Sequence, residues 1–159
     1  MKKYYIIFII LIIIMSVIFY ILRRNKEVIS EEDILNSNDI YINYRVTNMR
    51  DSKKYIFSIN ENESKYELLR YNDEVLVSTN IDKEDIKNLK DALIIGHVNK
   101  WDGFSKSNKY VMDGEMFDFT AKINGIKIYA TGSNSFPKGY RDFYNKINNI
   151  VKKYDIINE

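Results

Sequence analysis

Residues 116–131 read MFDFTAKINGIKIYAT, and this stretch decides the fold. Apolar and polar side chains alternate on both sides of Asn124-Gly125, which is the period of a strand with one buried face. A two-residue hairpin turn requires positive φ at both positions, and asparagine followed by glycine meets that requirement readily. The stretch therefore predicts an antiparallel hairpin with strands over 116–123 and 126–131.

The same period of two occupies residues 40–79, upstream of the hairpin. It begins with alternating apolar positions at Ile40, Ile42, Tyr44 and Val46. Polar punctuation divides the segment into four predicted strands, at 40–47, 54–59, 65–71 and 74–79. Four consecutive strands joined by short turns predict an antiparallel meander.

Two helices are predicted on either side of the hairpin. The first covers 83–95, with Asp82 as its N-cap and Gly96 in the left-handed conformation that ends a helix. The second begins near 135–137, where Pro137 suits a first turn, and runs to about Tyr154. Seven apolar positions recur in it at helical spacing: Tyr140, Phe143, Tyr144, Ile147, Ile150, Val151 and Tyr154.

The predicted order is β-β-β-β-α-β-β-α over residues 40–159, with an irregular stretch from 97 to 114. Hairpins without repeated βαβ crossovers favour an α+β fold of two layers, in which both helices cover one face of an antiparallel sheet. A sandwich or barrel is the alternative, but two strongly periodic helices make it a poorer fit.

Residues 4–22 read YYIIFIILIIIMSVIFYIL and contain no charged side chain. A helix of that length, at about 1.5 Å per residue, matches the hydrocarbon thickness of a bilayer. A cleaved signal peptide is the alternative, but no small-x-small pair precedes Arg23. The sequence thus predicts an uncleaved membrane anchor over 1–26, which makes the lipid bilayer a partner through 4–22, and a short tether over 27–39.

Basic residues flank the apolar run on both sides, with Lys2 and Lys3 before it and Arg23, Arg24 and Lys26 after it. Counting the α-amino group, the two sides balance under the rule that basic flanks stay cytoplasmic. A short basic N-terminus before an apolar run is the usual start of an exported segment, so we expect an extracytoplasmic domain on a single-pass protein. The use of Ile, Asn, Lys and Tyr favours a bacterial source.

The net charge of +2 hides an asymmetry between anchor and domain. Five of the 24 Lys and Arg residues flank the anchor, so the remaining 19 face 22 carboxylates and the domain carries a net charge of −3. This balance argues against nucleic-acid binding. The absence of cysteine excludes disulfides, thiolate metal sites and a lipid-modified cysteine.

Few residues suggest catalysis or metal binding. His97 is the single histidine, and it has neither a second histidine nor a cysteine to complete a metal site or a triad. The acidic clusters at 82–85 and 113–115 lack the spacing of a calcium loop. Residues 132–135, placed before the last predicted helix, are a weak candidate for an anion site. We predict no catalytic, cofactor-binding or metal-binding residue.

The stretch from Lys100 to Gly114 is long, aromatic and irregular. Loops of this kind are often binding surfaces, and the residues proposed for such a surface are Trp101, Asp102, Phe104 and Lys106. The alternative is that Trp101 and Phe104 close one end of the core, and the sequence leaves both interpretations open.

The C-terminal half carries a Trp101-x-Gly103-Phe104 segment, an Asp113-Gly114 turn, the Asn124-Gly125 hairpin and a Gly132-x-Asn134-x-x-Pro137 segment before a helix. This pattern, over about 60 residues, resembles small bacterial domains found behind membrane anchors or lipoprotein signals. The resemblance implies no assigned activity. The chain departs from the lipoprotein form because it lacks the cysteine.

These observations favour a membrane-tethered, non-enzymatic interaction or sensing domain on the outer face of a bacterial cell, with a protein or envelope component as partner. One alternative is a cytoplasm-facing accessory or immunity-type subunit of a membrane complex. The other is a hydrolytic enzyme without a recognisable motif.

Overall fold

The hairpin predicted around Asn124-Gly125 is present in the computed structural model of the chain. Strands β6 (Met116–Ile123) and β7 (Ile126–Ser133) pair antiparallel across it. The φ angles of Asn124 and Gly125 are +49° and +85°, so both residues adopt the left-handed backbone that the turn requires. The turn prediction is confirmed.

The structure describes residues 2–24, 28–70, 72–111 and 114–155. Parts of the prediction fall outside these ranges: residues 1 and 25–27 of the predicted anchor and tether, Tyr71 at the end of the third predicted strand, Asp113 in the predicted turn, and residues 156–159 at the end of the predicted domain.

The four-stranded meander is also confirmed. It consists of β1 (Ile40–Thr47), β2 (Ser52–Ile59), β3 (Ser64–Leu69) and β4 (Val75–Asn80). These strands pair antiparallel in sequence order, and β1 also pairs with β6, so the sheet order is β4-β3-β2-β1-β6-β7-β5.

The last strand in that order corrects the prediction of a purely antiparallel, six-stranded sheet. Strand β5 (Phe104–Ser107) lies within the stretch predicted to be irregular and pairs parallel with β7. It has four residues, of which Phe104 is half-buried and the other three are exposed. So short a strand at a sheet edge has no alternating pattern that a sequence reading could detect.

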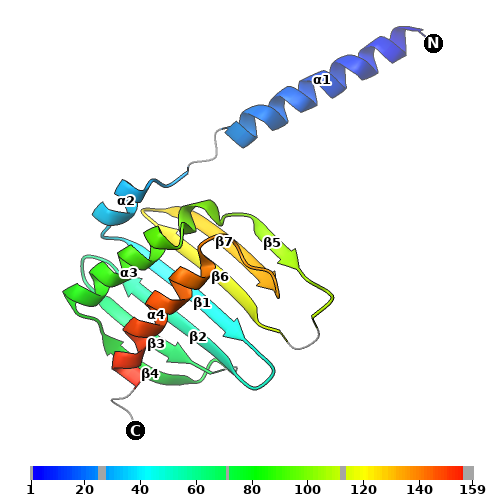
Figure 1. Ribbon diagram of the computed structural model, residues 1–159. Coiled ribbons are helices and arrows are strands. Elements are labelled where there is room, and N and C mark those ends of the chain that lie inside the picture. Colours follow the sequence, from blue (N-terminus) through cyan, green and yellow to red (C-terminus); the bar gives the residue numbers. More distant parts are fainter. Residues whose placement is uncertain (1, 25–27, 71, 112–113, 156–159) are drawn as a thin grey trace.

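Helices α3 (Lys83–Ile95) and α4 (Tyr140–Asp155) lie side by side over one face of the sheet (Figure 1), as predicted. The Asp82 side chain caps α3 by accepting a hydrogen bond from the Asp85 backbone N–H at 2.8 Å.

Two helix-end predictions are wrong. Gly96 has φ −69°, and His97, with φ +53°, is the residue that turns left-handed after α3. Pro137 lies three residues before α4 rather than in its first turn. Helix α4 begins only after Gly139, whose φ of +83° is incompatible with a helix.

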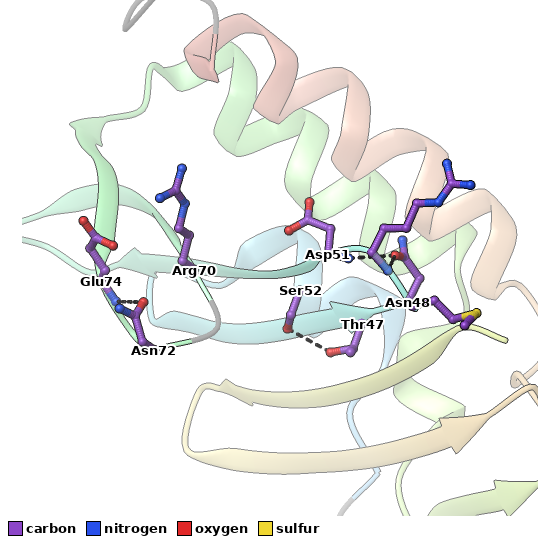
Figure 2. A pocket seen from close by; sticks show the side chains of 9 residues that line it. Thr47, Asn48, Asp51, Ser52, Arg70, Asn72 and Glu74 are labelled. Carbon is purple, nitrogen blue, oxygen red and sulfur yellow. Dashed lines mark hydrogen bonds between the residues drawn. The ribbon is translucent and has the colours of Figure 1, made fainter. Parts of the chain in front are cut away.

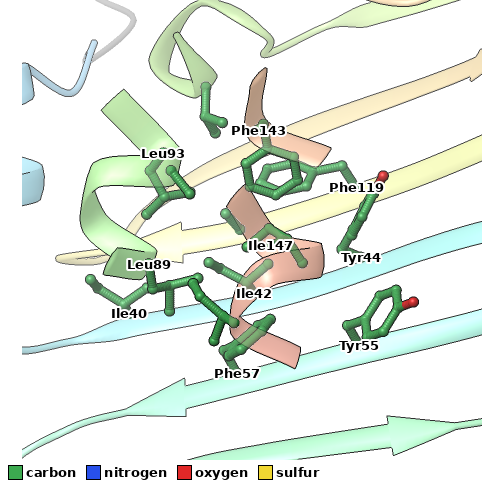
Figure 3. Packing of buried hydrophobic residues seen from close by; sticks show 14 of the residues in the cluster. Ile40, Ile42, Tyr44, Tyr55, Phe57, Leu89, Leu93, Phe119, Phe143 and Ile147 are labelled. Carbon is green, nitrogen blue, oxygen red and sulfur yellow. The ribbon is translucent and has the colours of Figure 1, made fainter. Parts of the chain in front are cut away.

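The core lies between the sheet and the two helices (Figure 3). Strand residues Ile42, Tyr44 and Phe57 meet Leu89 of α3 and Phe143 of α4, and all five are fully buried. The Tyr44 and Phe143 rings pack edge to face with centroids 5.2 Å apart. Alternation along β1 and the helical spacing in α4 therefore identified the buried faces correctly.

A short helix, α2 (Glu31–Asn36), lies in the range predicted as a tether. Ser30 forms a capping box with Asp33, and Ile29 and Ile34 are 1% and 0% exposed. The folded unit therefore reaches back to Ile29, ahead of the predicted boundary at residue 40. Six residues are too few to show a helical period in the sequence.

Helix α1 spans Lys2–Arg24. Its described side chains are Tyr4 and residues 8–18, and all of them are exposed. Within the part of the chain that the structure describes, no helix combines the length and the apolar character that a membrane crossing requires.

Candidate functional site

Three lysines converge around an aromatic pocket that no single segment of the sequence contains. The lining comes from the end of α3 and helix η1 (Val98–Lys100), from β5, and from the connection between β7 and α4. The pocket, called the lysine pocket below, has a volume of about 350 Å³ and is lined by His97, Lys100, Trp101, Phe104, Lys106, Phe136, Pro137 and Lys138. That volume lies within the usual range for small-ligand sites, about 300–1,000 Å³.

Two glycines bring the segments of this pocket together. A Cβ atom on Gly139 would lie 2.4 Å from the Gly96 carbonyl oxygen, and one on Gly96 would lie 2.7 Å from the Phe143 Cβ. The absence of a Cβ on Gly139 therefore lets the backbone before α4 touch the backbone after α3, and the absence of one on Gly96 leaves room for Phe143 of α4. This contact places Lys138 beside His97, two residues that are far apart in the sequence.

Trp101 lines the lysine pocket and belongs to the core. It is 1% exposed, and its ring packs edge to face against Phe119 and Phe143 at centroid distances of 5.1 and 5.2 Å. Its indole N–H donates a hydrogen bond to the Lys138 carbonyl oxygen at 3.1 Å. Of the two interpretations left open by the sequence, Trp101 follows the core one and cannot serve as an exposed contact.

Of the other predicted surface residues, Phe104 and Lys106 line the pocket and Asp102 does not. Phe104 is half-buried against the core, and the Lys106 ammonium lies 5.6 Å from the centre of the Phe104 ring. Asp102 does not line the pocket; its carboxylate accepts a hydrogen bond from the Tyr129 backbone N–H at 2.9 Å. This bond ties the loop after η1 to strand β7.

His97 has two unfavourable features in one residue. It is held in the left-handed conformation, with φ +53° and ψ +38°, which costs a residue with a Cβ roughly 1–2 kcal/mol. Its Nδ1 atom is also buried without a hydrogen-bond partner, and among the described residues it is the one side-chain nitrogen or oxygen in that situation. Strain and an unpartnered polar group at one position often mark a functional site.

A general-base role for His97 gains no support from its surroundings. A catalytic imidazole is normally oriented by a partner on its second nitrogen, usually a carboxylate. No carboxylate is among the described residues that line the pocket. The arrangement offers cationic groups and aromatic faces, which suit the binding of an anion with an apolar part.

A buried tyrosine pair stiffens the wall behind the pocket. The Tyr44 hydroxyl donates to the Tyr140 hydroxyl at 2.8 Å, which in turn donates to the Glu115 carboxylate at 2.8 Å. Burial raises the pKa of Tyr44 and the pKa of Tyr140 far above their usual range, so both remain protonated donors. The Tyr140 ring stacks on Phe136 with centroids 4.5 Å apart, which holds Phe136 in the pocket lining.

A second, larger pocket lies where the β1–β2 and β3–β4 turns meet (Figure 2). It has a volume of about 510 Å³. Two of its polar side chains hold the turns: Asn48 accepts from the Arg50 and Asp51 backbone N–H groups, and Asn72 accepts from that of Glu74. Because the lining mixes two arginines, Arg50 and Arg70, with two carboxylates, Asp51 and Glu74, it lacks the single sign of charge of the lysine pocket and is a weaker candidate.

A charged cluster joins the far ends of the two long helices. Lys153 on α4 donates to Asp82 at 2.8 Å and to the buried Asp85 at 2.9 Å, and the Tyr154 hydroxyl donates to Asp85 as well. The bond from Lys153 holds the pKa of Asp82 below its usual value. The acidic residues at the start of α3 thus act in helix capping and helix pairing.

The structure does not support the weak anion site at residues 132–135. Gly132 and Ser133 belong to β7, and α4 starts only at Tyr140, so these residues are not at a helix N-terminus. Within the described ranges, no group of three or more histidine or acidic residues is placed to hold a metal ion.

No protein-family model matches the chain. The comparison with curated proteins likewise returns no match. The resemblance to small anchored bacterial domains therefore stays a prediction, and any function has to be argued from the site.

Proposed function

We propose that this chain is a single-pass, membrane-anchored binding domain without catalytic activity, whose lysine pocket holds an anionic ligand. The observation that carries the proposal is the convergence of Lys100, Lys106 and Lys138 around an aromatic pocket. A cleft lined by charges of one sign concentrates ions of the opposite sign, so an arrangement of this kind attracts anions.

The composition of the pocket narrows the ligand class. Lysine ammonium groups bind phosphate or carboxylate as point charges. Phe104, Phe136 and Pro137 provide apolar surface next to them. A ligand with one anionic group and an adjacent apolar part fits this combination better than a bare ion would.

The anchor proposal rests on the run from Tyr4 to Leu22, which has no charged residue and is apolar apart from Ser16. Within this run, the side chains that the structure describes are those of Tyr4 and residues 8–18, and they are exposed rather than packed on the domain. Exposed apolar surface of this extent is typical of a membrane or partner contact. We place the domain on the extracytoplasmic side, where its ligand is an envelope component or a partner protein.

Thermal unfolding of the full-length protein in a neutral detergent tests ligand binding, with inorganic phosphate and glycerol phosphate as probes. Sodium chloride at matched ionic strength serves as the control. A probe present at ten times its Kd should add about 1.4 kcal/mol to the free energy of unfolding, or roughly 4 °C in Tm. Lys106→Gln should abolish this shift, whereas Lys127→Gln, at an exposed position in β7 outside the pocket, should retain it.

His97→Gly gives an independent readout of the same pocket. Glycine adopts the left-handed conformation freely, so the substitution should raise stability by about 1 kcal/mol if His97 is strained. A functional role for His97 predicts that the same variant loses part of its phosphate response. Higher stability with an unchanged stabilisation by phosphate would show that His97 takes no part in binding.

Topology is tested separately by a reporter enzyme fused after Glu159. Activity of a reporter that works only outside the cytoplasm supports the proposed orientation. Activity of a cytoplasmic reporter instead would favour the accessory-subunit alternative.

A further inference from the structure

The chain that follows the predicted anchor packs directly against the segment that forms the lysine pocket. Ile29 is 1% exposed, and its carbonyl oxygen accepts a hydrogen bond from the Asn99 side-chain amide at 3.2 Å. Asn99 lies in η1, immediately before Lys100. The chain that leads from the predicted anchor is therefore hydrogen-bonded, at Ile29, to the segment that forms one wall of the pocket.

This packing limits how far the pocket can lie from the bilayer. The predicted span ends at Leu22, and six residues, 23–28, separate it from Ile29. Even when fully extended, the seven residue-to-residue steps from Leu22 to Ile29 reach only about 25 Å. The limit depends on chain length and on the Ile29 contact alone, so it holds for any orientation of α1.

We propose that the lysine pocket binds the phosphate of an anionic phospholipid headgroup in the bilayer to which the chain is anchored. The inference rests on the proposed function and names the ligand of that same site. Juxtamembrane lysines gain roughly fivefold in association each near an anionic surface. A short connection also turns headgroup binding into an intramolecular step with a high effective concentration.

The charge distribution favours a specific site over general attraction. The domain as a whole is net negative, and the exposed Glu31 and Glu32 of α2 follow closely after the anchor. An anionic surface repels both carboxylates, and Arg23, Arg24 and Lys26 belong to the flank of the anchor rather than to the domain. Within the domain, the clustered lysines of the pocket offer an attraction that the net charge does not. Phe104 and Phe136, half-buried beside these lysines, supply apolar contacts of the kind found at the membrane interface.

The experiment uses the full chain in nanodiscs of neutral phosphatidylcholine, alone or mixed with phosphatidylglycerol. Amine acetylation followed by mass spectrometry measures the protection of each lysine. The proposal predicts that acetylation of Lys100, Lys106 and Lys138 is at least roughly fivefold slower in the anionic discs than in the neutral discs. Lys83 and Lys87, exposed on α3, should react equally in both.

A matched pair of variants separates the pocket from general charge. In the Lys106→Gln variant, the protection of Lys100 and Lys138 from acetylation should fall by roughly fivefold. Lys127→Gln should leave this protection unchanged. Equal acetylation in neutral and anionic discs would overturn the inference, as would equal protection of the pocket lysines and the α3 lysines.

Glycerol phosphate added to the neutral discs distinguishes the lipid from a soluble phosphate. Protection by glycerol phosphate without protection by anionic lipid would overturn the lipid assignment and leave the proposed anion pocket standing. Protection by neither would overturn both. Protection by the anionic discs that disappears with Lys106→Gln supports the headgroup site.

Discussion

Replacing Trp101 with alanine should remove a large part of the stability of the domain. The side chain is 1% exposed and packs edge to face on two phenylalanines, with ring centroids 5.1 and 5.2 Å away. Truncation of a buried aromatic residue to alanine costs about 3–5 kcal/mol. The Lys138 carbonyl also loses its donor, so we expect the upper part of that range, out of a total of about 5–15 kcal/mol for a domain.

The measurement is urea unfolding of the fragment 28–159, which retains Ile29 and all of the elements after α1. Far-UV circular dichroism is the appropriate signal, because Trp101 is the single tryptophan and its fluorescence disappears with the substitution. Trp101→Phe provides a milder change: it keeps an apolar ring and loses the N–H donor, for about 1–2 kcal/mol.

Tyr110→Ala is the matched control, since Tyr110 is 98% exposed and its loss should change stability by no more than about 0.5 kcal/mol. A loss below about 1 kcal/mol for Trp101→Ala would refute the reasoning, because truncation of a core aromatic cannot be so mild. Such a result would return Trp101 to the role of an exposed binding residue.

Three further predictions concern glycines and charges. Gly125→Ala, with φ +85° and open space around a new Cβ, should lower the free energy of unfolding by about 1–2 kcal/mol through backbone strain alone. Gly139→Ala, with a similar φ of +83°, should cost more, because its Cβ would lie 2.4 Å from the Gly96 carbonyl oxygen; equal Tm losses for the two variants would contradict that close approach. The lowered pKa of Asp82 predicts that its pairing with Lys153 stabilises the fold above the ordinary carboxyl pKa of 3.8 and that this contribution disappears as the pH falls below that value. Lys153→Gln should therefore flatten the acid decline in unfolding curves taken between neutral and low pH, and an unchanged decline would count against the ion pair.

Strands with one buried face were predictable, because alternation is a property of consecutive residues. The alternation at Ile40 to Val46 and the Asn124-Gly125 turn identified β1 and the β6–β7 hairpin with their buried faces. Helical spacing did the same for α4. These are local signals, since the residues of each buried face recur at a regular spacing within one segment of the chain.

Helix ends and short elements were less predictable. Gly96 was expected to be left-handed, but that conformation falls on His97, and Gly96 is a glycine because Phe143 leaves no room for a Cβ. Pro137 was placed in a helix that starts three residues later. A glycine required for packing and a glycine required for its φ angle look the same in a sequence.

The candidate site was predictable only in part. Trp101, Phe104 and Lys106 were selected because they lie in a long aromatic stretch, and all three line the pocket. Lys138 and Phe136 were missed, because nothing in a sequence links them to residues so far upstream. They reach the pocket through the contact between two glycines before α4 and after α3.

The sequence by itself determined the α+β class, the antiparallel meander, the buried faces of β1 and α4, and the apolar run that predicts an anchor, because each of these depends on the spacing of neighbouring residues. Only the tertiary structure decided that Trp101 is a core residue, that Ile29 packs beside η1, and that three lysines share one pocket. The physical reason is that burial and convergence depend on contacts between distant segments, which form only when sheet and helices close around a common core.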